Sequence, residues 1–86
     1  MKEEPTLTLT KVICKKLKYE PISIDLLFKG YRAKLCITEN KDEVIKEIQR
    51  KLDRLFCKFV KIKIRKLIFR KKWVISILVP FNRKNI

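Results

Sequence analysis

The stretch that decides the fold is KFVKIKIRKLIFRKKWVISILVP, residues 58–80. From residue 60 to 65 aliphatic and cationic residues alternate, so a strand here has one apolar and one cationic face. This pattern predicts a strand over about 59–69, in which Arg65-Lys66 interrupts the alternation and suggests a bulge. The apolar run 73–79, closed by Pro80, predicts a second strand, and residues 70–72 predict the turn between them. The stretch therefore indicates an antiparallel hairpin.

The positive charge of the chain is concentrated in the same region. The 86-residue chain has a formal net charge of +14. Residues 54–86 contain eleven Lys and Arg and no Asp or Glu, whereas residues 1–53 contain twelve Lys and Arg and all nine acids. An asymmetry of this size indicates a polyanionic partner.

The segment before the hairpin has the pattern of an amphipathic helix. Apolar residues recur at intervals of one, three and four from Val44 to Phe56, which places them on one stripe. Asn40 is a candidate N-cap, and Asp42 and Glu43 suit the positive end of the helix dipole. We predict a helix from about Lys41 to Cys57 that covers one face of a sheet.

The first 38 residues favour strands. Thr6 to Thr10 alternate as in a strand, and a break of phase at residues 12–14 suggests a bulge within a strand over about 6–19. Two more strands are predicted over 22–28 and 31–37. Lys29-Gly30 links them, with a positive φ expected at Gly30.

These elements predict an α+β fold with a small antiparallel sheet, in the order β-β-β-α-β-β, and one amphipathic helix packed on one face. An OB-like five-stranded barrel shares this order and is the alternative, by analogy of topology. An open sheet is favoured, because a tightly coiled barrel needs more than the single glycine of this chain. Residues 1–86 suit a single domain, with 1–5 and 82–86 as frayed ends.

Composition excludes several kinds of chemistry. The chain has no His, so His-dependent acid–base and triad mechanisms are excluded, and its single Gly rules out a Gly-rich phosphate loop. Cys14, Cys36 and Cys57 are widely spaced, form no CxxC pair and are expected to be reduced thiols. No metal site and no cofactor are predicted.

The leading functional hypothesis is a small, non-enzymatic protein that binds DNA or RNA through phosphate contacts. An architectural or regulatory role is expected, and a viral, plasmid or small-genome setting is a guess from size and composition. Trp73, Phe69 and Tyr31 would add base stacking if they were exposed, although Trp73 and Phe69 also fit a core. The cations alternatively form a solvated, edge-protecting face. The predicted binding residues are Lys61, Lys63, Arg65, Lys66, Arg70, Lys71, Lys72, Trp73, Arg83 and Lys84.

The sequence has two alternative interpretations, a metal-dependent nuclease and a protein-interaction module. Asp25, Glu39 and Lys41 resemble, weakly, the Asp…Glu-x-Lys arrangement of a metal-dependent nuclease family, which implies Mg²⁺ on the carboxylates and transition-state stabilisation by Lys41. Glu39 and Lys41 lie at a predicted helix start, however, and not in an apolar strand, so we expect no enzyme. The other alternative is a protein-interaction module, which would form a homodimer or meet an acidic protein.

The predicted location is cytoplasmic. The start of the chain, MKEEP, has no apolar h-region, which argues against a signal peptide. No apolar run approaches the ~20 residues of a membrane span. A soluble, intracellular protein is therefore expected.

Overall fold

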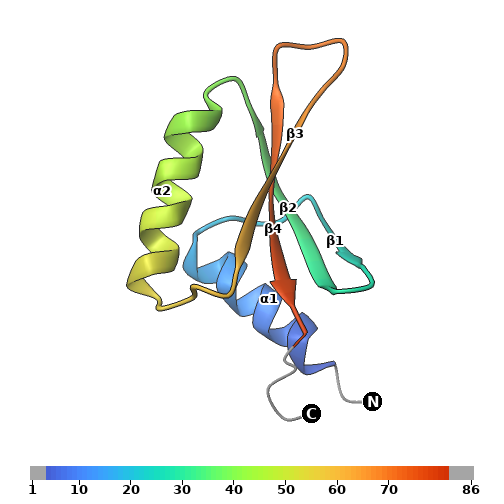
Figure 1. Ribbon diagram of the computed structural model, residues 1–86, viewed down its shortest axis with the longest axis vertical. Helices are drawn as coiled ribbons and strands as arrows, with labels where there is room; N and C mark the ends of the chain where they lie inside the picture. Colours follow the sequence, from blue (N-terminus) through green and yellow to red (C-terminus); the bar gives the residue numbers. More distant parts are fainter. Residues whose placement is uncertain (1–3, 82–86) are drawn as a thin grey trace.

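The computed structural model describes residues 4–81 and shows an α+β fold. Its four strands form one antiparallel sheet in the order β1-β2-β4-β3 (Figure 1). The elements in chain order are α1 (Pro5–Lys16), β1 (Ser23–Leu26), β2 (Gly30–Thr38), α2 (Lys41–Arg54), β3 (Lys61–Lys66) and β4 (Trp73–Pro80). The sheet is open, with β1 and β3 at its edges, so the barrel alternative is not what the structure has.

Both helices pack on the same face of the sheet. The core joins Ile13 and Leu17 of α1 with Ile48 and Leu52 of α2, and all four side chains are buried. The sheet contributes alternate residues of its two central strands to this core, namely Ala33, Leu35, Ile75, Ile77 and Val79. Burial of such a continuous apolar layer is the main stabilising term of a two-layer domain.

The predicted first strand over residues 6–19 is wrong, because this segment forms α1. Glu4 is the N-cap and its carboxylate accepts a hydrogen bond from the Leu7 amide at 3.0 Å, while Pro5 occupies the first helical position. The Thr10 hydroxyl donates to the Thr6 carbonyl at 2.7 Å, and both threonines are buried. Two threonines thus belong to the apolar stripe of a helix, and the order becomes α-β-β-α-β-β.

The helix predicted over 41–57 is confirmed as α2, although it ends at Arg54. Asn40 occupies the N-cap position, but its side chain makes no capping hydrogen bond. Lys51 of α2 donates from Nζ to the Leu17 carbonyl at 3.0 Å, and so satisfies an acceptor at the end of α1.

Each helix ends in the same left-handed turn. The Tyr19 amide donates to the Cys14 carbonyl and the Cys57 amide to the Leu52 carbonyl, the hydrogen bonds of a Schellman motif. The residue in the left-handed position is Lys18 after α1, at φ 64°, and Phe56 after α2, at φ 57°. Neither is the glycine that usually stands there.

The β1–β2 connection also differs from its prediction. Gly30 does not have a positive φ. Glycine is required instead because a Cβ there would collide with the Val79 carbonyl group and with Cα of Pro80 on the neighbouring strand. The turn is closed by the Leu27 amide, which donates to the Gly30 carbonyl at 2.8 Å.

A bulge in β2 changes which side chains share a face. Lys34 pairs with Ser76 and Cys36 with Ile75, so Leu35 is the extra residue. The alternation predicted that Cys36 would share a face with Arg32 and Lys34. The bulge moves Cys36 to the helix side, and the next residue, Ile37, to the opposite face.

The hairpin of β3 and β4 extends to the end of the molecule opposite α1 (Figure 1). The two strands pair from Lys61–Leu78 to Lys66–Trp73. Strand β4 matches its prediction closely, whereas β3 is shorter than the predicted 59–69. Neither helix within residues 4–81 has the length and hydrophobicity to cross a membrane.

Candidate functional site

One face of the sheet is covered by neither helix and carries most of the cations of the strands. We call it the uncovered face. The pairing places three rows of side chains on it. The rows are Asp25–Arg32–Leu78–Lys61, Ser23–Lys34–Ser76–Lys63 and Ile37–Val74–Arg65.

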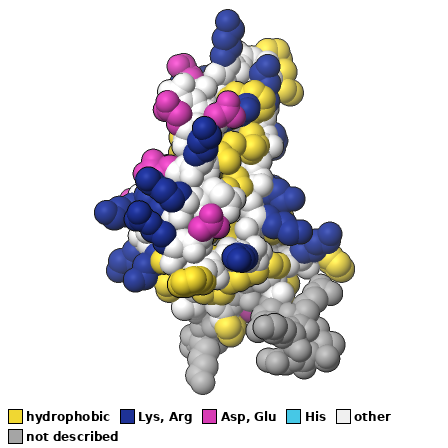
Figure 2. Space-filling model, turned by 60° about the vertical axis from the view of Figure 1, so that its left-hand side comes forward, with side chains coloured by type: hydrophobic (Ala, Val, Ile, Leu, Met, Phe, Trp, Pro, Cys, Tyr) yellow, Lys and Arg dark blue, Asp and Glu magenta, His cyan; other side chains and the backbone are white. Residues whose placement is uncertain are grey.

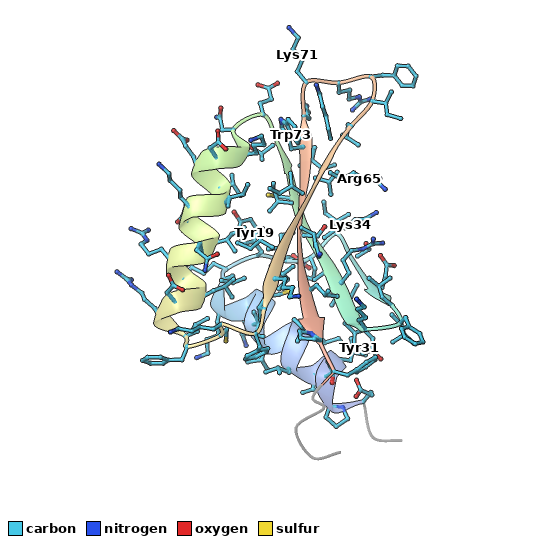
Figure 3. All side chains as sticks on the ribbon, viewed as in Figure 1. Tyr19, Tyr31, Lys34, Arg65, Lys71 and Trp73 are labelled. Carbon is cyan, nitrogen blue, oxygen red and sulfur yellow. The ribbon has the colours of Figure 1, made fainter. Side chains whose placement is uncertain are left out.

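Cations flank the centre of this face on both sides. Lys61, Lys63 and Arg65 follow the edge strand β3 at steps of about 6.6–6.8 Å, the spacing of alternate strand residues. Lys34 lies across β4 from Lys63, about 9–10 Å away at the Cα atoms by the usual strand spacing. In Figure 3, Lys34 and Arg65 lie on the side of the sheet away from α2.

Asp25 is the one acid in these three rows, and it is paired. Its Oδ2 lies 3.2 Å from an Nη of Arg32, in a partly exposed salt bridge. This salt bridge neutralises the charge of Arg32 on the uncovered face. Lys34, Lys61, Lys63 and Arg65 have no acid opposite them in the pairing, so the face has a strong positive potential.

The centre of the face is a narrow apolar strip on β4. Val74, Ser76 and Leu78 are only 6%, 4% and 8% exposed, although neither helix packs on them. Long Lys and Arg side chains stand on both neighbouring strands, and the methylene stems of such side chains can lie along apolar surface while the charges stay in water. The ammonium and guanidinium groups thus remain available to an anionic ligand.

The turn that joins β3 and β4 extends the cationic surface. We call residues 67–72 the tip. The Leu67 amide donates to the Lys72 carbonyl at 3.0 Å and closes the turn. Arg70 and Lys71 are exposed and Lys72 is half-buried. Lys71 projects from the end of the hairpin (Figure 3).

Two predicted binding residues lie on the other side of the hairpin. Lys66 and Trp73 pair with each other at its distal end, on the face of Ile75 and Ile77. The Trp73 ring lies between two cations, with Lys41 Nζ at 5.0 Å and Lys66 Nζ at 5.7 Å from its centroid. Half-buried Trp73 therefore does not lie on the uncovered face as a stacking platform.

The remaining aromatic and terminal predictions have separate outcomes. Tyr31 lies on the helix side of the sheet, where it makes an edge-to-face contact with Phe81 at 5.8 Å between centroids. Phe69 is 96% exposed at the tip and is not a core residue. Arg83 and Lys84 lie outside the described residues.

The side of the molecule formed by α2 has a different charge pattern. Acidic and basic side chains are mixed on it in Figure 2. Helix α2 itself carries Asp42, Glu43, Glu47 and Asp53 among its lysines and arginines. The charge of α2 is therefore nearly balanced, in contrast to that of the uncovered face.

The nuclease-like residues are not brought together. Asp25 pairs with the Arg32 end of β2, whereas Glu39 follows Thr38 at the other end. Six strand residues separate these ends by about 20 Å. Within residues 4–81 no group of three or more His, Cys, Asp or Glu could hold a metal ion.

The three cysteines are free thiols with raised pKa values. Burial raises the pKa of Cys14 to about 11. Burial also raises the pKa of Cys57, and that of Cys36 despite a hydrogen bond with Tyr19 that lowers it. The thiolate is the reactive form, so none of these thiols is activated at neutral pH.

Comparison of the chain with protein-family models, with curated proteins and with solved structures found no match. The assignment of the candidate site therefore rests on the geometry of the structure alone. Sequence reasoning left Arg32 and Lys34 out of it, although they alternate along their strand. What it could not supply was the strand order that places β2 next to β4.

Proposed function

We propose that this protein binds nucleic acid through the uncovered face and the tip, mainly by contacts to the phosphate backbone. The observation that carries the proposal is the group of Lys34, Lys61, Lys63 and Arg65 on a sheet face without a covering helix. An unpaired cationic surface of this kind attracts a polymer with regularly spaced negative charges.

The predominance of lysine on the uncovered face favours contacts to the phosphate backbone over contacts to the bases. Lysine is a flexible point charge, and lysine contacts to phosphates position a nucleic acid without reporting its sequence. The centre of the face offers Ser76 as its polar group, and this side chain is buried between Val74 and Leu78. Binding with low sequence preference follows, which suits an architectural or regulatory role.

Binding should depend steeply on salt. Four cations of the uncovered face and three of the tip could displace up to seven counterions. The plot of log K against log salt would then have a slope of about −4 to −6 on a duplex, and a smaller one on a single strand.

Fluorescence anisotropy with labelled single- and double-stranded DNA and RNA of one sequence tests the proposal. Micromolar or tighter binding retained near 0.15 M salt, with a slope implying several phosphates, is the expected result. Loss of all binding well below that salt concentration would leave only general charge attraction. It would favour the alternative, an interaction module for an acidic protein.

A further inference from the structure

The tip carries two apolar side chains that the described part of the protein leaves uncovered. Ile68 is 87% exposed and Phe69 is 96% exposed, in adjacent positions of the turn. Their neighbours Arg70 and Lys71 are exposed cations. Exposing an aromatic and a branched aliphatic side chain side by side in water is unfavourable, and such a pair next to two cations marks a candidate contact surface.

The turn is held in a defined position. Besides the Leu67–Lys72 hydrogen bond, the distal end of the strand pair is fixed next to the turn by Trp73, whose ring lies between Lys41 of α2 and Lys66 of β3. The turn that bears the two apolar side chains lies at one end of the molecule (Figure 1).

The tip is continuous with the uncovered face. The last row of that face, Ile37–Val74–Arg65, is the row next to the tip, and Ile37 is half exposed. A polymer that lies along β3 from Lys61 to Arg65 therefore reaches the tip. A flat anionic membrane that received Phe69 would not contact Lys61 at the other end of β3, because the strand from Lys61 to Lys66 spans about 17 Å.

We propose that Phe69, with Ile68 beside it, inserts as a wedge between neighbouring base pairs of a bound duplex. Arg70 and Lys71 would hold the phosphates on either side of the opened step. Apolar wedges flanked by cations can unstack one base step and kink the duplex, which brings more of it against the protein. This inference rests on the proposed function and adds to it a bending activity and the residues that perform it.

The test uses a duplex that contains 2-aminopurine, a base whose fluorescence rises when it is unstacked, and donor and acceptor dyes at its two ends. The full-length protein is compared with its Phe69→Ala variant. Phe28→Ala is the matched control, because Phe28 is 90% exposed in the β1–β2 turn at the opposite end of the sheet. Each variant thus removes one exposed ring.

For the wild type and Phe28→Ala we expect a rise in 2-aminopurine fluorescence and a shorter end-to-end distance on binding. Phe69→Ala should lose both signals. Its affinity should fall by about 5- to 150-fold, the range for loss of one base–aromatic contact. Its salt slope should stay steep, because the cations of the uncovered face and the tip are all kept.

The two proposals fail in different ways. Wild-type protein that binds with a steep salt slope, but gives no unstacking signal, overturns the wedge and leaves the proposed function in place. Equal effects of Phe69→Ala and Phe28→Ala overturn the wedge as well. Wild-type protein that binds single strands but no duplex overturns the wedge alone. Wild-type protein that binds neither single- nor double-stranded nucleic acid, but whose Trp73 fluorescence is quenched by brominated phosphatidylserine vesicles, overturns both.

Discussion

Lys41 Nζ, in the first turn of α2, lies 5.0 Å from the centroid of the Trp73 ring at the start of β4. Lys66 approaches the same ring at 5.7 Å. These two contacts connect the helix layer to the distal half of the hairpin. The register of β4 places Trp73 on the helix side, together with Ile75 and Ile77, and there the two lysines half-bury its ring.

Replacing Lys41 by Met should lower the free energy of unfolding by about 0.5–1 kcal/mol, because it removes a cation–π contact but keeps the side-chain length. Urea denaturation followed by the fluorescence of Trp73, the single tryptophan, measures the change. Lys46→Met, at an exposed position of the same helix, is the control and should change stability by less than about 0.5 kcal/mol. Equal losses in the two variants would contradict this role of Lys41.

The sequence predicted the later elements better than the first one. The stripe of α2 and the apolar run of β4 are long patterns with a single period, and both elements form where expected. Thr6 to Thr10 alternate like a strand, but Pro5 and the carboxylate of Glu4 start a helix there, and its stripe buries two threonines. A pattern of apolar residues alone misses that stripe.

The candidate site was predicted only in part, for reasons of pairing. Alternation placed Lys61, Lys63 and Arg65 on one face, and the register confirms it. That Lys34 lies across β4 from Lys63 depends on a strand order that local sequence does not contain. Trp73 could be predicted either as a stacking residue or as a core residue, because alternation along β4 does not tell which face the helices cover.

Phe56→Gly should stabilise the protein by about 0.5–1 kcal/mol. Phe56 has φ 57°, a conformation that glycine adopts without steric cost, and its ring is 85% exposed and so contributes little packing. Phe59→Gly is the matched control, because Phe59 has no positive φ and its ring is more buried. This second variant should be destabilised. Thermal unfolding of the wild type and of both variants measures these changes in stability. A Phe56→Gly protein less stable than the wild type would contradict the prediction and indicate a packing role for the ring.

The buried thiol of Cys14 should make the protein less stable at alkaline pH. Burial raises the pKa of its thiol from 9.0 to about 11, so above pH 9 the unfolded chain loses this proton more readily than the folded protein. The contribution of this thiol to the free energy of unfolding is complete below pH 9. It is lost as the pH rises to about 11, and the total loss is roughly 2–3 kcal/mol. Urea unfolding of wild type and Cys14→Ala across this range isolates it from other titrating groups. Parallel pH profiles would contradict the assignment.

Removing the charge of the tip should weaken binding to all sequences alike. We expect the Arg70→Ala, Lys71→Ala and Lys72→Ala triple variant to reduce the salt slope by up to about three units on a duplex, near one for each lost contact. Two duplexes of unrelated sequence, titrated at several salt concentrations, provide the comparison. An unchanged slope would remove the tip from the binding surface.

If the uncovered face, and not the total charge of the protein, binds the nucleic acid, two triple Gln variants with equal net charge should behave differently. Both are compared with the wild type in one salt-dependent anisotropy titration. One replaces Lys34, Lys63 and Arg65 of the uncovered face, and the other replaces the exposed Lys46, Arg50 and Arg54 of α2. We predict that the first lowers the slope by about two to three units and that the second leaves it nearly unchanged. Equal losses in the two variants, or a larger loss from the α2 variant, would contradict the claim.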